Sequence, residues 1–170
     1  RTIIVNGVSK AYAMTGWRIG FIAAPEWIVK GCNKLQGQYT SGPCSVSQKA
    51  AEAAYTTSQE CVETMRKAFE RRRDLIVELA KDIPGLEVNK PEGAFYLFPK
   101  CSSFFGKSYN GKKIENSTDL AMFLLEVGHV ATVGGDAFGD PYCFRMSYAT
   151  SDDNIREAMK RIKDTLALLA

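Results

Sequence analysis

The sequence predicts an α/β fold, because short apolar runs of strand length alternate with longer segments of helical periodicity. Two runs near the start, TIIV at residues 2–5 and RIGFIAAP at residues 18–25, lack alternating polar residues. Such uninterrupted apolar runs are typical of strands that helices cover on both faces of a parallel sheet. The last half of the chain instead mixes short strand patterns with helices, which predicts a separate α+β unit.

The first part of the chain predicts two strands followed by two helices. A strand such as TIIV makes a poor sheet edge, so we expect neighbouring strands upstream and a chain that is the C-terminal part of a larger protein. Pro25 ends the second strand, because proline has no N–H to donate to a ladder. Residues 26–39 predict a helix with an apolar stripe, and Ser45 is a candidate N-cap for an Ala-rich helix that ends near Tyr55.

The second part begins with a long helix over residues 58–82, which has a regular apolar stripe and ends at IPG. Arg71, Arg72 and Arg73 on this helix are interpreted as a solvated face. Further elements are expected as strands at 92–99, 130–133 and 142–149 and as helices at 117–127 and from Ser151, a candidate N-cap, to the C-terminus.

Composition excludes several classes of function. The net charge of +3 is small and spread along 170 residues, which argues against a nucleic-acid or membrane surface. Five widely spaced cysteines without CxxC spacing argue against a zinc site and against a disulfide framework, and favour a reducing cytoplasm. The only histidine, His129, is interpreted as structural, and no metal site is expected.

Lys10 is the first candidate for chemistry. By itself it reads as a solvated loop residue after a strand, but small residues surround it and Arg18 follows eight positions later. Small residues let a ligand approach the backbone, and the guanidinium fork of arginine suits a phosphate. A desolvated lysine beside another cation becomes a nucleophile toward carbonyls. A carbonyl compound that carries a phosphate, such as pyridoxal 5'-phosphate (PLP), would satisfy both residues.

The stretch SKAYAMTGWRIG resembles the lysine motif of the fold-type I, PLP-dependent aminotransferases of classes I and II. Its ending is most similar to the bacterial aspartate aminotransferase subgroup, which includes prephenate aminotransferases. Three further blocks of this family follow in the same order, namely EGAFYLFP, GDAFG and FRMSYATSDDNIREAMKRI. The resemblance covers essentially the whole chain and implies the C-terminal part of the aspartate-aminotransferase-like fold.

The resemblance assigns cofactor roles to three residues. Lys10 would form the Schiff base with PLP and then move the proton between the substrate α-carbon and the cofactor. Arg18 would hold the cofactor phosphate, and Ser9 would add a hydroxyl to it. Relatives often carry a second serine three positions before the lysine, where this chain has Gly7.

The resemblance also assigns substrate roles. Arg145 corresponds to the arginine that binds the α-carboxylate, and strand alternation places it beside the small residues Cys143, Ser147 and Ala149, with room for a planar anion. Gly93 and Phe95 match the substrate-side wall of the small domain. Gly134 replaces the usual proline of the GGDAFG loop, which we expect to loosen that loop.

The implied organisation has two parts. Residues 1–57 would be the end of the large PLP-binding domain, and residues 58–170 would be an interdomain helix and the small domain. Family members form homodimers, and the loop at residues 40–47 is a candidate interface element. Uncovered strands at the start of the chain should expose apolar surface.

Three functions remain open at this point. The first is transamination of an amino acid and a 2-oxo acid, with aspartate and 2-oxoglutarate favoured. The second is another PLP-dependent aminotransferase or β-lyase reaction on the same fold. The third is a non-catalytic, aminotransferase-like domain, although Lys10 and Arg145 argue against it. The family's partner for the pyridine nitrogen and its ring-stacking aromatic lie upstream of the lysine, so we expect these 170 residues alone to be inactive.

Overall fold

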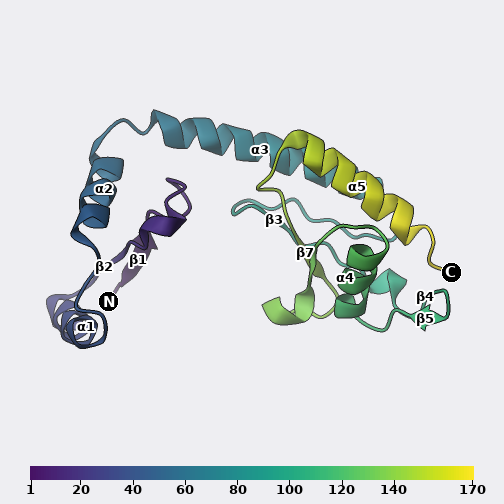
Figure 1. The fold of residues 1–170 in the computed structure, drawn as a ribbon, viewed down its shortest axis with the longest axis horizontal. Helices are drawn as coiled ribbons and strands as arrows, with labels where there is room; N and C mark the ends of the chain where they lie inside the picture. Colours follow the sequence, from purple (N-terminus) through teal and green to yellow (C-terminus); the bar gives the residue numbers. More distant parts are fainter. The chain divides into compact units, whose positions relative to one another are not determined.

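The computed structural model describes residues 1–170, which form two compact units (Figure 1). The first unit is residues 1–66 and the second is residues 67–170. This division falls inside the long helix α3 (Glu60–Lys81), whereas the sequence placed the domain boundary before that helix.

The first unit contains a two-stranded sheet. Strand β1 (Ile4–Gly7) pairs with β2 (Gly20–Ala23), with Val5 opposite Ile22 and Gly7 opposite Gly20. The pairing is antiparallel, so the expectation of strands of parallel type was wrong for this pair. Both strands are largely exposed, which agrees with the expectation that uncovered strands at the start of the chain expose apolar surface. Two strands alone leave outer edges and apolar side chains without cover, as the 76% exposure of Val5 shows.

Two helices complete this unit. Helix α1 (Glu26–Tyr39) has the predicted bounds, yet it buries no residue, and Trp27 and Leu35 of its apolar stripe are exposed. Helix α2 spans Ser45–Thr56. Ser45 is not its N-cap as expected, because the backbone of Cys44 is still non-helical (φ −55°, ψ 130°) and Cys44 therefore occupies that position.

The second unit contains a three-stranded antiparallel sheet in the order β3 (Tyr96–Leu97), β7 (Phe144–Ser147), β6 (Val133–Gly134). A separate hairpin joins β4 (Ser108–Tyr109) to β5 (Lys112–Lys113). The strands are shorter than predicted. Ala94 (φ 60°) adopts a left-handed conformation before β3. Beyond β3 the pairing with the β7 segment continues only through single contacts, such as the Phe144 N–H to Pro99 carbonyl bond and the Lys100–Cys143 bridge.

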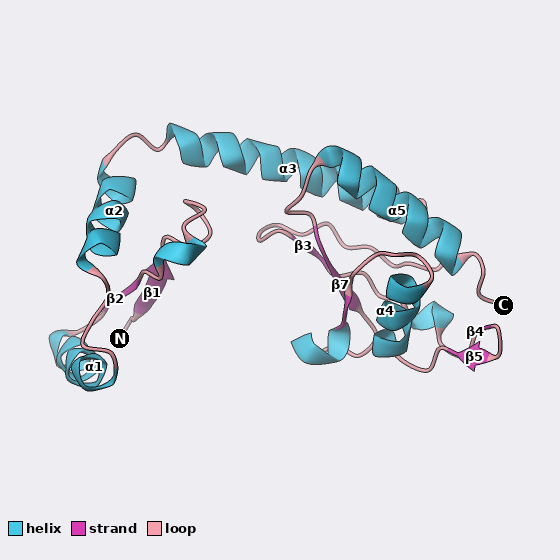
Figure 2. Cartoon of the chain, in the orientation of Figure 1, coloured by secondary structure: helices cyan, strands magenta, loops and turns pink.

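Helices α3, α4 (Ser117–Glu126) and α5 (Asp152–Leu166) pack with this sheet (Figure 2). Caps begin two of them: Asn116 accepts from the Asp119 N–H, and Ser151, as predicted, accepts from the Asn154 N–H. The core of the unit is continuous and includes Leu97, Leu120, Leu124, Phe144, Tyr148, Ile155 and Ile162, all at most 2% exposed.

The three consecutive arginines of α3 are not a simple solvated face. Arg71 contacts the Asp152 carboxylate at the start of α5 through two hydrogen bonds, of 3.0 and 3.1 Å, and Arg72 reaches the same carboxylate at 3.4 Å. Arg73 is only 17% exposed and pairs with Asp74 at 2.9 Å. Arg71 and Arg72 therefore link α3 to the start of α5, whereas the carboxylates paired with Arg73 belong to α3 itself.

Candidate functional site

The Lys10 loop leaves β1 through a buried anchor. Val8 is fully buried and its carbonyl accepts from the Tyr12 N–H, while the Ala13 N–H donates to the Lys10 carbonyl. These bonds fold residues 8–13 into a tight turn that presents Lys10 at the surface, with Ser9 half-buried beside it. Lys10 is exposed in this unit, so residues 1–66 alone do not supply the desolvation that would make its amine a nucleophile.

An aromatic cluster holds the same loop against α2. The Tyr12 hydroxyl donates to the Gln59 Oε1 at 2.7 Å, and the Tyr12 ring meets Tyr55 edge-on, with centroids 5.1 Å apart. Phe21 of β2 packs on the same Tyr55 ring at 5.6 Å. Sequence reasoning did not assign a role to Tyr12, although its place two residues after Lys10 was a usable signal.

Arg18 lies at the other end of this loop in a strained conformation. Its backbone is left-handed (φ 55°, ψ 48°), which is uncommon for a residue other than glycine and frequent at binding sites. Its Nη1 donates to the Thr15 carbonyl at 2.7 Å, and no carboxylate contacts the guanidinium. The loop therefore carries a permanently charged, exposed group without an acidic partner, which suits an anionic ligand.

Gly7 departs from the family pattern for a visible reason. It lies opposite Gly20 in the β1–β2 ladder, and a Cβ at position 7 would come within 2.8 Å of the Ile19 carbonyl oxygen. A serine would force these two strands apart. In this chain, Ser9 is consequently the hydroxyl next to Lys10.

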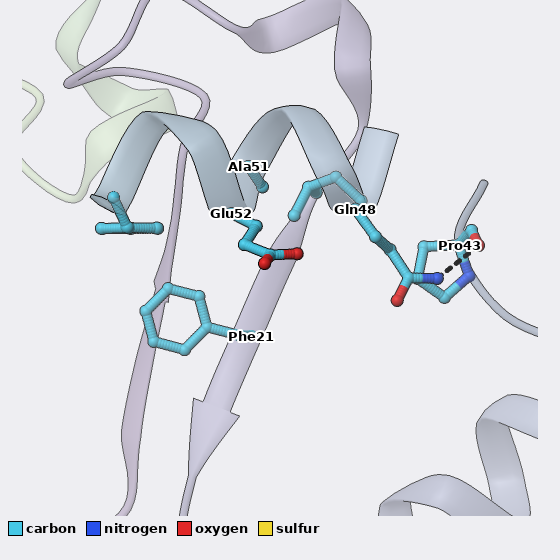
Figure 3. A pocket seen from close by; sticks show the side chains of 8 residues that line it. Phe21, Pro43, Gln48, Ala51 and Glu52 are labelled. Atoms are coloured by element: carbon cyan, nitrogen blue, oxygen red, sulfur yellow. Dashed lines mark hydrogen bonds between the residues drawn. The ribbon is translucent and has the colours of Figure 1, made fainter. Parts of the chain in front are cut away.

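A pocket of about 400 Å³ opens between β2 and α2 (Figure 3). Phe21, Ala51 and Glu52 line it, and Gln48 crosses one side to donate to the Pro43 carbonyl at 2.9 Å. None of the residues predicted to bind cofactor or substrate lines this pocket. It borders the Lys10 loop at Ile19, next to Arg18, and at Tyr55, which Tyr12 contacts.

Arg145 is the central feature of the second unit. It lies on β7 opposite Val133, and its guanidinium carbon is 4.3 Å from the centre of the Tyr96 ring and 3.9 Å from that of Phe138. The expected surroundings of small side chains are incomplete, because two aromatic rings also contact the guanidinium. Alternation along one strand describes only that strand's own neighbours, whereas these rings come from β3 and from the short helix η3 (Gly135–Phe138).

The charge of Arg145 has no partner in the protein. The side chain is half-buried and makes no hydrogen bond or ion pair. Both carboxylates of the adjacent loop are engaged elsewhere: Asp136 accepts from the Thr118 hydroxyl, and Asp140 accepts from the Tyr142 N–H and the Cys143 thiol. Sequence reasoning missed Tyr96 and Phe138, although both stand inside the EGAFYLFP and GDAFG motifs.

Gly93 and Phe95 flank the left-handed Ala94. Gly93 is exposed, and a Cβ there would meet nothing within 4 Å. Phe95 is half-buried and packs on Phe69, with centroids 5.9 Å apart. The Tyr148 hydroxyl donates to the Ala94 carbonyl at 3.0 Å, and burial raises the pKa of Tyr148.

The GGDAFG loop is closely packed at Gly134. The backbone (φ −57°) would accept proline, but a Cβ would lie 2.6 Å from the Thr118 Oγ1. The next residue is also fixed in place, because the Gly135 N–H donates a hydrogen bond to the Ser117 hydroxyl at 3.0 Å. This packing gives a steric reason for glycine in the proline position and does not support the expectation of a looser loop.

No group of three or more His, Cys, Asp or Glu side chains is arranged to hold a metal ion. His129 is exposed in a left-handed conformation (φ 54°) just after α4, a position where a helix commonly ends. None of the helices combines the length and apolar character needed to cross a membrane.

Comparisons with known proteins give a consistent result. The chain is 48% identical over 99% of its length to a bifunctional aspartate aminotransferase and glutamate/aspartate-prephenate aminotransferase of Petunia hybrida, and 48% identical over 95% to an aspartate aminotransferase of Rhizobium meliloti. It spans only 36% and 40% of the lengths of these relatives.

Solved structures agree. The crystal structure of the aspartate aminotransferase from Rhizobium meliloti matches all of the chain with a TM-score of 0.96 at 46% identity, and the chain covers 43% of it. An aromatic aminotransferase from Pyrococcus horikoshii matches 98% of the chain with a TM-score of 0.88 at 39% identity. The family model for aminotransferase class I and II matches residues 1–162. This chain therefore belongs to the class I and II aminotransferase family.

Proposed function

We propose that this chain takes part in the PLP-dependent transamination of an amino acid with a 2-oxo acid, aspartate with 2-oxoglutarate being the favoured pair. The observation that carries the proposal is Arg145, a half-buried guanidinium between two aromatic rings and without an acidic partner. Such a group suits a carboxylate, which it can bind through two parallel hydrogen bonds. Family membership supports the reaction class.

The residues around Lys10 fit the cofactor. An exposed primary amine, a neighbouring hydroxyl and a guanidinium without a carboxylate match an aldehyde that carries a phosphate. Lys10 would hold the aldehyde carbon, while Arg18 and Ser9 would bind the phosphate. When bound, PLP supplies an electron-withdrawing ring that makes the substrate α-C–H acidic.

Two residues would act on the substrate itself. After the substrate amine takes its place, the Nζ of Lys10 would remove the proton from the substrate α-carbon, a contribution of about 10²–10⁴-fold for a positioned general base. Arg145 would bind the α-carboxylate and so fix the orientation of the C–H bond. Gly93 leaves open space beside Phe95, which supports their assignment as a wall on the substrate side.

Aspartate is favoured as the amino donor because relatives 46–49% identical to the chain are named aspartate aminotransferases. Prephenate is a second candidate for the amino acceptor, because the Petunia hybrida relative and one from Cereibacter sphaeroides, both 48% identical, are named for it. A β-lyase reaction has no comparable support among these relatives.

The first test is covalent trapping. The complete polypeptide that contains these residues is incubated with PLP, reduced with borohydride and mapped by peptide mass. We expect one adduct on Lys10 that the Lys10→Ala variant loses and the Lys34→Ala variant, which removes another exposed lysine of the first unit, retains. Adducts spread over many lysines and unchanged in Lys10→Ala would contradict the cofactor role.

The second test is the reaction. Oxaloacetate and glutamate should form from aspartate and 2-oxoglutarate, and Lys10→Ala should abolish their formation. Prephenate in place of 2-oxoglutarate separates the two acceptors. We propose that the isolated 170 residues are inactive in this assay, because they present no acidic residue before Lys10 to pair with the pyridine nitrogen.

Location and assembly follow as parts of the proposal. All five cysteines are free thiols, which supports a reducing compartment such as the cytoplasm. The segment at residues 40–47, whose last three residues belong to α2, is flanked by Tyr39, 83% exposed, and contains Val46, 67% exposed, which supports a homodimer contact there. Sedimentation of the complete polypeptide with Val46→Glu should show monomers if this loop lies in the dimer interface.

A further inference from the structure

We propose that Tyr96 and Phe138 are positioning residues that set the affinity of Arg145 for the substrate carboxylate. The inference rests on the proposed function, since it assumes that Arg145 binds a carboxylate. It extends that function by naming the groups that hold the arginine ready and by stating what they change, which is binding rather than the chemical step.

The two rings fix the plane of the guanidinium. Its central carbon lies 4.3 Å from the Tyr96 ring centre and 3.9 Å from the Phe138 ring centre. These distances fit a sandwich in which each ring covers a different face of the group. A guanidinium stacks favourably on aromatic faces, because the negative face of the ring attracts the cation. The side chain is thereby held without any hydrogen bond.

The rings are themselves supported. Phe98 meets Phe138 edge-on with centroids 6.2 Å apart and nearly perpendicular planes (87°), and Phe95 lies 4.6 Å from Tyr96. Tyr96 stands opposite Ser147 in the ladder, diagonal to Arg145 on the same strand face. These neighbours restrict the rotamers of both rings, so the sandwich is built by the sheet rather than by loose surface contacts.

Stacking leaves the hydrogen-bonding edge of the arginine available. The N–H donors point outward in the guanidinium plane, while the rings cover only the faces, and no protein acceptor approaches that edge. An arginine held in place before the ligand arrives loses less side-chain entropy on binding, which raises affinity. The rings also exclude water from the faces and strengthen the pair formed at the edge.

Ordinary core packing does not account for Phe138. Its side chain is 43% exposed, so it buries little apolar surface compared with Leu97 or Phe144. The Phe138 ring instead contacts the Arg145 guanidinium, and neither carboxylate of the same loop pairs with that cation. A role in positioning Arg145 explains this placement better than core packing does. Tyr96 is half-buried and contributes to both packing and positioning.

The experiment measures carboxylate binding in the complete polypeptide. The probe is succinate as a competitive inhibitor, with KM and kcat for aspartate and the Kd for PLP measured alongside. Phe138→Leu and Tyr96→Leu should weaken succinate binding and raise KM by about 3- to 30-fold. We expect kcat and the Kd for PLP to stay near the unsubstituted values, because uniform binding is lost and not transition-state stabilisation.

Three comparisons separate positioning from structure. Phe138→Tyr and Tyr96→Phe keep a ring and should restore most of the affinity. Tyr142→Leu is the control, because Tyr142 lies just before β7 and packs on Phe105 rather than on Arg145. This substitution should leave succinate binding unchanged. In an Arg145→Leu background, Phe138→Leu should have no further effect, because the rings act only through the arginine.

The outcomes distinguish the two proposals. If Arg145→Leu leaves succinate binding unchanged, the carboxylate role itself is wrong. If Arg145→Leu weakens binding but Phe138→Leu does not, only the positioning role is overturned. Should Tyr96→Leu fail to fold, the exposed Phe138 still decides, and equal losses for Phe138→Leu and Phe138→Tyr would count against a role for the ring.

Discussion

The two units differ sharply in how they bury apolar residues. In residues 67–170 a continuous core links the sheet to three helices, and Leu120, Phe144 and Ile162 are fully buried. In residues 1–66 the only buried hydrophobic residues are Val8 and Ala51, while ten large ones, among them Val5, Trp27 and Tyr39, are exposed. Apolar burial is the main favourable term in folding, so the second unit has its own source of stability and the first does not.

The difference also separates the two candidate groups of site residues. Arg145 stands on a strand of the well-packed unit, where neighbouring rings fix its orientation. Lys10 and Arg18 stand on a loop whose only deep anchor is Val8, helped by the contacts of Tyr12. A rigid scaffold thus supports the proposed carboxylate site, whereas the proposed cofactor site depends on apolar surfaces that nothing in its unit covers.

The largest expected effect comes from separating the regions. We expect residues 58–170, made alone, to unfold cooperatively on heating and residues 1–57 to show no cooperative transition and little native secondary structure. Circular dichroism and a dye for exposed apolar surface measure both. A cooperative transition of residues 1–57 would show that this segment is stable despite its exposed apolar side chains. The proposed difference in stability between the two regions would then be wrong.

Core truncation should show the same contrast on a smaller scale. In the 170-residue chain, Phe144→Ala removes a fully buried ring and should cost about 3–5 kcal/mol of unfolding free energy. Leu35→Ala removes a side chain that is 62% exposed and should change it by less than about 0.5 kcal/mol. Urea titration gives both values. Similar losses for the two variants would mean that α1 is covered in solution.

Thiol reactivity sharpens the comparison residue by residue. Burial raises the pKa of Cys101 to about 12 and that of Cys143 to about 11, where the Asp140 carboxylate adds to the effect. Backbone N–H groups of Ser47 and Val46 at the start of α2 lower the pKa of the exposed Cys44. Because the thiolate is the reactive form, iodoacetamide near neutral pH should modify Cys44 first and leave both buried thiols unmodified.

Mass mapping of partly alkylated protein gives the order of modification, with Cys32 and Cys61, both exposed, as internal references. In urea all five cysteines should react at similar rates. Rapid modification of Cys143 in the folded protein would show that the second unit opens more readily than its packing indicates.

The sequence predicted helices better than strands. The bounds of α1 were found from a proline and a periodic stripe, and those of α3 from a stripe and IPG, because these signals are local. The strands were predicted too long, since nothing in the apolar pattern marks the left-handed backbone of Ala94 or the residue at which pairing with a distant strand stops. The same limit hid the rings on Arg145: alternation places a side chain on a face but cannot say which residues of other strands and loops meet it there.

The smallest expected effect concerns the link between α3 and α5. The pKa of Asp152 lies below its ordinary value, mainly because Arg71 donates hydrogen bonds to this carboxylate. The positive charge of Arg71 and the weaker contact with Arg72 act in the same direction. A carboxyl with a depressed folded pKa contributes stability above its unfolded pKa of about 3.9, and that contribution is lost as the pH falls through the folded value. Asp152→Asn should therefore lower the thermal midpoint near neutral pH and make its fall in acid shallower.

Asp153→Asn is the matched control. Asp153 lies in the same first turn of α5 and experiences the same helix dipole, but no arginine pairs with it, so its substitution should leave the acid limb almost unchanged. Some slope should persist in every variant, because Lys90 and Arg73 lower the pKa of Asp74 as well. If Asp152→Asn and Asp153→Asn changed the thermal midpoint equally, the effect would come from the dipole at the start of α5. The pairs of Asp152 with Arg71 and Arg72 would then contribute nothing measurable to the stability of the second unit.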